Sequence, residues 1–439
     1  MSLRRRVATV CAAVLGALVV MVAVAGPASA HAELVASDPS QGTVIGSEPT
    51  QVTLRFSEEI VLRLSAVKVI GPDGRRLDAG ALHAGPLGAD SMAVDLAADA
   101  RHGTFVVVWQ VTAADDGHAS SGTVMFAVGA ASVPASVAGL GHDRLTSAVY
   151  DAGQWTGFAG LAMVGGVAAL HTYRRKELTS GTDASTEPAA PVPSTTPTWP
   201  AALGWSLLLI GTLIQLTAYA PAARGLPLSH LLDRSLLSVT LATREGHAFM
   251  ARLLVLAVAA VVGDAVLRRA AGPGVPLTFT LAMAATWGAT GHAATGSGAP
   301  VAMVALTLHV AAMAVWVGGL FMVAVLLAGR GDAVAAAVRR FSRLALGAVA
   351  VLVATGLYQA WREVGSVSAL LDTTYGRLLL TKVAILLCVI GVARRSRGIV
   401  ATWRGGSEAL LRRTVLLELA GASALLLLAV LLAGNAPAR

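Results

Sequence analysis

The chain has 439 residues, of which 55% are hydrophobic and only 13% are charged. Soluble domains contain about 25% charged residues, so this composition indicates a membrane protein with modest aqueous parts. The net charge of +8 comes from short basic clusters between apolar runs, as in the cytoplasmic loops of membrane proteins, so we expect a lipid bilayer and no nucleic acid among the partners.

Residues 1–30 have the three parts of a secretory signal peptide. A basic start over 4–6 precedes an apolar stretch over 7–25, and Ala28-Ser29-Ala30 forms a small-residue cleavage site. Cleavage at this point would make His31 the mature amino terminus. The apolar stretch is somewhat long, so an uncleaved membrane anchor is the alternative interpretation.

Residues 31–129 are mixed in polarity and contain short strand-like runs between turn residues. In the run GTFVVVWQVT, residues 103–112, the alternate positions from Phe105 to Val111 fall on one face of a strand. Several short strands within one domain predict an all-β Greek-key sandwich of immunoglobulin-like or cupredoxin-like type, followed by a linker over 130–146. The other predicted strands are 53–60, 66–70, 92–96 and 122–128.

From residue 147 to residue 435 the chain consists mainly of long apolar segments, each near the roughly 20 residues that cross a bilayer. This pattern predicts an all-α polytopic membrane bundle of about eight helices. A stretch rich in Ser, Thr, Pro and Ala over 177–198 predicts a disordered cytoplasmic loop after the first helix. The predicted helices are 148–172, 199–220, 247–267, 276–291, 301–328, 343–361, 375–393 and 411–433.

The basic residues between these segments set the expected orientation. Clusters such as Arg174-Arg175-Lys176 and Arg394-Arg395 follow alternate segments, whereas the other connections are poorer in Lys and Arg. By the positive-inside rule, the richer connections are cytoplasmic. We therefore expect a multi-pass protein of the plasma membrane whose amino-terminal domain and C-terminus lie outside the cytoplasm.

The expected amino terminus has the groups of a metal site. The free amine and the imidazole Nδ1 of His31 can chelate one ion together, and nitrogen-rich sites of this kind suit copper(II). The tripeptide Asp116-Gly117-His118, between two predicted strands, supplies the remaining ligands, because Gly117 lets the backbone turn so that both side chains converge. Taken alone, the tripeptide is also explained by an ordinary turn.

Two stretches of the amino-terminal domain resemble the CopC family of periplasmic copper-binding proteins. They are HAELVASDPSQGTVIGSEP followed by TLRFSEEI, and GTFVVVWQVTAADDGHASSGTVMFAV. The resemblance implies a copper(II) site formed by His31, Asp116 and His118. The chain departs from the family in having Asp115 as a possible competing carboxylate. It also lacks a Met-rich stretch, so a copper(I) site is not expected in this domain.

The membrane part resembles the partner family CopD, which makes the chain similar to a CopC–CopD fusion. The resemblance covers roughly residues 146–433 and implies copper uptake across the membrane or copper tolerance. The stretches that carry it are GHAATGSGAP, LHVAAMAVWVGGL, TTYGRLLLTKVAILL and LRRTVLLEL.

His and Met residues within the membrane segments suggest a copper relay below the sandwich. His309 and Met313 lie one turn apart on one helix face, and a histidine at that depth needs a partner in the bilayer. His247 and His292 fall at the outer ends of the third and fourth segments. The alternatives are that Met313 only packs and that the two outer histidines only bind water or lipid headgroups.

We therefore expect copper ions as the bound metal and a copper import or homeostasis protein that is not an enzyme. Two other functions fit parts of the pattern. Intramembrane histidines could ligate haem in an electron carrier. An amino-terminal histidine that chelates copper also occurs in copper monooxygenases, although the Asp ligand would block the position that oxygen needs. The sequence leaves the oligomeric state open.

Overall fold

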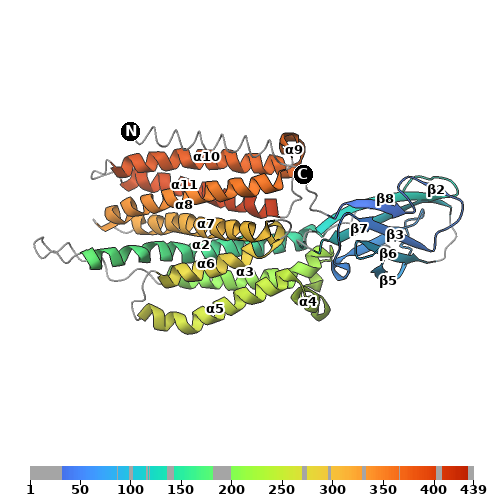
Figure 1. Ribbon diagram of the computed structural model, residues 1–439, viewed down its shortest axis with the longest axis horizontal. Helices are drawn as coiled ribbons and strands as arrows, with labels where there is room; N and C mark the ends of the chain where they lie inside the picture. Colours follow the sequence, from blue (N-terminus) through green and yellow to red (C-terminus); the bar gives the residue numbers. More distant parts are fainter. Residues whose placement is uncertain are drawn as a thin grey trace, which may run out of the picture.

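A computed structural model shows a β-sandwich at one end of a bundle of long helices (Figure 1). The sandwich lies at the end of the bundle where the third predicted membrane segment, residues 247–267, begins. The structure describes residues 32–86, 88–97, 102–114, 117, 119–135, 143–180, 199–268, 274–294, 298–328, 333–364, 366–401 and 408–433.

Two four-stranded sheets form the domain, which confirms the predicted β-sandwich. The strand order is β1-β3-β6-β5 in one sheet and β2-β8-β7-β4 in the other. All neighbouring strands are antiparallel except β2 and β8, which run parallel. The strands are β1 (Leu34–Asp38), β2 (Val44–Ile45), β3 (Gln51–Phe56), β4 (Ala66–Ile70), β5 (Asp78–Ala84), β6 (Ser91–Leu96), β7 (Gly103–Thr112) and β8 (Ala119–Val128).

Aromatic rings from both sheets fill the space between them. Phe56 on β3 meets Trp109 on β7 edge to face with 5.2 Å between the ring centroids. Phe105 stacks on Phe126 of β8 at 5.1 Å. These rings are buried together with alternate aliphatic residues of β3 and β7, so the predicted apolar face of residues 103–112 does form the core.

Long helices occupy all eight predicted membrane segments. Five of them are long and apolar enough to cross a bilayer: α3, α7, α8, α10 and α11. The membrane crossing of the other three remains a prediction. The long helices are α2 (Arg144–Ser180), α3 (Trp199–Ala223), α5 (Arg244–Arg268), α6 (Gly274–Gly288), α7 (Ala299–Ala328), α8 (Ala333–Glu363), α10 (Thr374–Ala401) and α11 (Glu408–Ala433).

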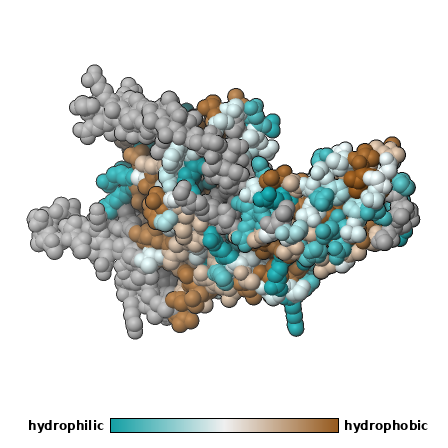
Figure 2. Space-filling view, turned by 45° about the vertical axis from the view of Figure 1, so that its right-hand side comes forward, coloured by the Kyte–Doolittle hydropathy of each residue, from teal (hydrophilic) through white to brown (hydrophobic). Residues whose placement is uncertain are grey.

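Short elements connect the long helices at the end that faces the sandwich. They are the 3₁₀ helices η2 (Leu228–His230) and η3 (Gly291–Ala294), and the α-helices α4 (Arg234–Leu241) and α9 (Val367–Asp372). Hydrophobic side chains gather over the described long helices, whereas the sandwich surface is more mixed (Figure 2). This distribution is the one expected of a membrane domain joined to an aqueous domain.

Helix α2 packs closely against α3 and α7 through small residues. A Cβ atom on Gly318 of α7 would lie 1.7 Å from the carbonyl oxygen of Ala162 on α2, so no side chain fits there. Gly160 and Gly204 face each other in the same way between α2 and α3. Small residues at helix contacts let backbones approach closely within a membrane.

Helix α2 extends to Ser180 and therefore covers the start of the segment 177–198 that we expected to be a loop. Arg, Lys, Glu and Leu over 174–178 favour helix, so the helix propensity of these residues prolongs α2 beyond the apolar stretch. Residues 181–198 and the predicted signal peptide lie outside the described part of the chain.

Candidate metal centre

The predicted copper motif lies in the connection between β7 and β8, at the end of the sandwich that faces the helices. Of its residues, the structure describes Gly117, whereas His31, Asp116 and His118 and the competing Asp115 lie outside the described residues. Gly117 has a φ of +73°, and its N–H donates to the carbonyl oxygen of Ala113 at 3.2 Å. The backbone therefore turns at the glycine as the sequence predicts.

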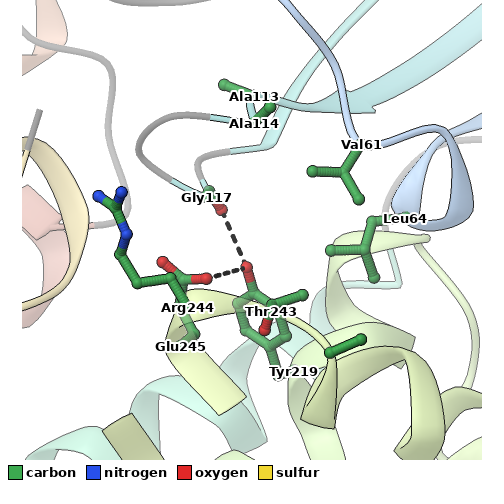
Figure 3. A pocket seen from close by; sticks show the side chains of 10 residues that line it. Val61, Leu64, Ala113, Ala114, Gly117, Tyr219, Thr243, Arg244 and Glu245 are labelled. Carbon is green, nitrogen blue, oxygen red and sulfur yellow. Dashed lines mark hydrogen bonds between the residues drawn. The ribbon is translucent and has the colours of Figure 1, made fainter. Parts of the chain in front are cut away.

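A cavity of about 170 Å³ lies between Gly117 and the membrane domain (Figure 3). The sandwich and the start of α5 each supply about half of its wall, and the hydroxyl end of one α3 side chain reaches into it. Its lining residues are Val61, Leu64, Ala113, Ala114, Gly117, Tyr219, Ala242, Thr243, Arg244 and Glu245.

Two polar side chains of the membrane domain reach Gly117 directly. The Tyr219 hydroxyl lies 3.1 Å from Oε2 of Glu245, to which it donates, and 3.4 Å from the carbonyl oxygen of Gly117. A Cβ atom on Gly117 would lie only 2.5 Å from Oε1 of Glu245. The backbone angle therefore favours glycine here, and the carboxylate of Glu245 would have to shift to admit a side chain.

Local sequence explains why Glu245 is held at this place. Thr243 precedes α5, and its Oγ1 accepts a hydrogen bond from the N–H of Gly246 at 3.0 Å, which caps the helix. Glu245 lies in the first turn of α5, where the helix dipole stabilises a carboxylate. Arg244 is held beside it, because its Nη1 donates to the carbonyl oxygen of Ala294 at 3.1 Å.

An apolar cluster beside the cavity joins the two domains. Leu64, fully buried in the sandwich connection before β4, packs among Leu216, Tyr219 and Phe249 of the membrane domain. Gln110 on the outer face of β7 adds polar contacts, because its Nε2 donates to the backbone carbonyls of Ala222 and Ala223 at the end of α3. The sandwich is therefore anchored on the helices rather than only tethered by the linker.

Below the cavity, Arg252 of α5 is buried in a polar network, with only 2% of its surface exposed. Its Nε donates to Oγ1 of Thr286 at 2.7 Å, and its Nη1 donates to Oε1 of Gln215 at 3.0 Å. The guanidinium also lies 3.6 Å from the ring centroid of Trp287. These contacts join α5 to α3 and α6, so Arg252 stabilises the packing of these helices.

The residues of the predicted membrane relay are distributed over different elements. His309 lies within α7, where its Nδ1 is 2.9 Å from Oγ1 of Thr355 on α8. Met313 is buried one turn further along α7, whereas His247 is exposed near the start of α5. His292 lies in η3, and its side chain is outside the described part.

The surroundings of His309 include a cationic side chain. Lys382 of α10 lies within electrostatic range of the imidazole, and Glu363 lies within range of Lys382 in turn. A protonated Lys382 repels a metal cation that would bind at His309. Among the described residues, no three His, Cys, Asp or Glu side chains form a group that could hold a metal ion. The relay through His247, His292, His309 and Met313 therefore stays a prediction.

Sequence reasoning missed Tyr219 and Glu245, although both contact the turn of the copper motif. Each lies at the end of an apolar segment, where polar residues are common and need no special explanation. The available signal was the expected orientation, which places the start of 247–267 on the same side of the membrane as the sandwich. That signal names a side of the membrane but no individual residue.

Family comparisons match two separate parts of the chain. Residues 34–129 match the family described as the CopC domain. Residues 335–432, which include most of α8 and all of α10, match the family described as copper resistance protein D. The second match begins after α7, so it does not include His309 or Met313.

Individual proteins are similar to this chain over all or part of its length. The chain is 26% identical over 422 residues to copper transport protein CutJ of Bacillus subtilis, covering 89% of this chain and 74% of that protein. It is 30% identical over 106 residues to copper resistance protein C of Pseudomonas syringae pv. tomato, covering 23% of this chain and 82% of that protein. The crystal structure of CopC from Methylosinus trichosporium OB3b aligns with 22% identity and a TM-score of 0.21, covering 24% of this chain and 100% of that one.

Proposed function

The chain belongs to the CopC family through its sandwich and carries a CopD domain in the same polypeptide, and we propose that it captures copper(II) outside the cytoplasm and imports it. The apolar helices make it a multi-pass membrane protein that handles copper. The import direction and the residues that bind copper are the parts that we propose.

In this proposal, His31 supplies its amine and imidazole, and Asp116 and His118 complete the copper(II) site. Two nitrogen ligands from one amino-terminal residue cost little chain ordering, and the imidazole and carboxylate fit the preference of copper(II) for nitrogen and oxygen. The left-handed backbone of Gly117 supports this arrangement, because it is the turn that the sequence predicts between the two motif ligands.

The observation that carries the proposal is the position of Gly117 against the membrane domain. Its contacts with Tyr219 and Glu245 keep this glycine beside the end of α3 and the start of α5, and this closeness supports the passage of a captured ion from one domain to the other. A sandwich that only sequestered copper would have no need for this contact. Copper tolerance by sequestration is therefore less well supported than delivery to the membrane.

Changing His118 to Ala tests the capture site. We expect the His118→Ala variant of the full chain to bind copper(II) at least about a hundredfold more weakly in a competition titration, because an imidazole ligand is lost. His83→Ala, which alters a histidine on β5 beside Asp95, is the matched control and should bind like the wild type. Equal copper(II) affinity of His118→Ala and the wild type would contradict the site.

Cellular copper accumulation tests the direction. Cells that express the wild-type chain should accumulate more copper than cells without it, and His118→Ala should remove most of the difference. Lower accumulation in the expressing cells would indicate export or sequestration instead of import.

A further inference from the structure

We propose that Glu245, together with the Tyr219 hydroxyl, is the first copper acceptor of the membrane domain. In this inference, which rests on the proposed function, copper(II) leaves the motif on the sandwich and binds oxygen ligands in the cavity between the domains. Neither residue belongs to the predicted capture site or to the predicted His and Met relay.

The position of the carboxylate is the first support. Oε1 of Glu245 lies 2.5 Å from the place where a Cβ of Gly117 would be, and Cα atoms of neighbouring residues are about 3.8 Å apart. Asp116 and His118 are the two chain neighbours of Gly117. The carboxylate therefore packs against the glycine that separates the two proposed motif ligands in the sequence, and we infer that an ion changes ligands at this contact without entering bulk water.

The composition of the cavity wall is the second support. The carboxylate of Glu245, the phenol oxygen of Tyr219 and the carbonyl oxygen of Gly117 lie together at one end of the cavity (Figure 3). The remaining wall consists of Val61, Leu64 and three alanines together with Thr243 and Arg244. The apolar side chains strengthen the attraction between the carboxylate and a divalent ion, and the guanidinium of Arg244 is bound to the carbonyl oxygen of Ala294.

Ligand chemistry sets the relative copper affinities of the two sites. Copper(II) binds nitrogen-rich sets more tightly than oxygen sets, so an oxygen site holds the ion more weakly than the capture site. A weaker site beside a stronger one can release its ion onward, as an intermediate in a path must. The step is a ligand exchange in which copper remains copper(II), and no electron is transferred.

The buried Arg252 network limits where the ion can go next. Its guanidinium lies deeper along α5, the helix that begins beside Glu245, and its positive charge repels a cation moving along α5 toward the membrane interior. The cavity can therefore receive the ion, but the charge of Arg252 opposes its direct movement along α5. Onward movement has to follow another face of the bundle.

The test compares Glu245→Gln with the wild type in the full chain. Glutamine keeps the size of the side chain and an oxygen that can accept from Tyr219, but it removes the charge. We expect cellular copper accumulation to fall about tenfold, the lower end of the effect of losing a metal-orienting carboxylate. The copper(II) affinity of the purified chain in lipid nanodiscs should change less than about twofold, since the capture ligands are intact.

Asp233→Asn is the matched control. Asp233 is a carboxylate on the same side of the bundle, it does not line the cavity, and asparagine is an equally good cap for α4. This variant should accumulate copper like the wild type. Tyr219→Phe is a second variant that keeps the ring and removes only the hydroxyl, and it should lower accumulation by about fivefold or less.

Three outcomes would overturn the inference. Wild-type accumulation in both Glu245→Gln and Tyr219→Phe would show that the cavity oxygens take no part. Loss of copper(II) affinity in Glu245→Gln to the level of His118→Ala would make Glu245 a resident ligand of the capture site and not an acceptor. An equal decrease in Asp233→Asn would show a general effect of surface charge. Failure of the proposed function is separate, because it appears as unchanged copper(II) affinity in His118→Ala.

Discussion

The β-sandwich buries aromatic rings between its sheets, whereas the helical domain buries an arginine, a glutamine and a glutamate among its helices. In the sandwich, the described charged side chains lie outside the core, as in the pair formed by Arg55 and Asp90. In the helical domain, Arg252 bonds to Gln215 and Thr286, and Ser396 bonds to Thr414 and to Glu418 between α10 and α11.

This difference follows from the surroundings of each core. Water can satisfy polar groups around the sandwich, so its interior needs only apolar contacts. Helices in lipid gain little from apolar contacts with each other, and hydrogen bonds and close packing hold them together instead. Replacing a buried polar residue of the helical domain should therefore cost the most stability. Replacing an aromatic ring in the sandwich core should cost less, and replacing a charged residue on the surface should cost the least.

Gln215→Leu should have the largest effect on stability. It removes the acceptor for Nη1 of Arg252 and leaves a buried guanidinium partly unsatisfied, at a cost of about 3 kcal/mol. Thermal unfolding of the full chain in detergent micelles measures this effect. Adding Arg252→Met to Gln215→Leu removes the unsatisfied charge and should recover part of the loss. A double variant no more stable than Gln215→Leu would contradict this account.

Phe126→Leu should have an intermediate effect that is confined to the sandwich. It removes the ring stacked on Phe105 and costs about 1.5 kcal/mol through lost stacking and imperfect repacking. Hydrogen exchange followed by mass spectrometry should show lower protection in β7 and β8 and unchanged protection in α7. An equal loss of protection in α7 would mean that the two cores unfold as one unit.

Arg55→Gln should have the smallest effect. The Arg55 side chain is about half exposed, and its 3.0 Å ion pair with Asp90 is of a kind that contributes up to about 1 kcal/mol. The unfolding midpoint should therefore stay close to that of the wild type at moderate salt. A loss of stability as large as that of Gln215→Leu would show that burial does not determine how much a polar contact contributes to stability.

Hydropathy and strand alternation predicted most of the fold. Strands β4 and β7 have the predicted bounds, and each predicted membrane segment contains a long helix, because these elements bury continuous or alternating apolar residues. Strands β1, β2 and β5 were missed. β2 has two residues, and β1 and β5 are largely exposed or half-buried, so none of the three has a strong apolar pattern.

The candidate site was predicted only in part. The turn at Gly117 follows from the local sequence, and its left-handed backbone confirms that prediction. Its neighbours Tyr219 and Glu245 are distant in the chain, and their contact with Gly117 depends on how the sandwich docks on α3 and α5. Docking of this kind is set by shape and by contacts such as those of Gln110, which no periodicity in the sequence encodes.

The anchoring of the sandwich through Gln110 and Leu64 also bears on how fast and how selectively copper can move. A copper motif fixed beside Glu245 presents its ion at a high effective concentration. This concentration is on the order of millimolar for short flexible tethers, and a rigid contact in the right geometry can exceed it. An acceptor in such a place can be filled even if its affinity is far too low to take copper from solution. In the proposed transfer, chelators in the surrounding medium compete for the capture step rather than for the passage between the two domains.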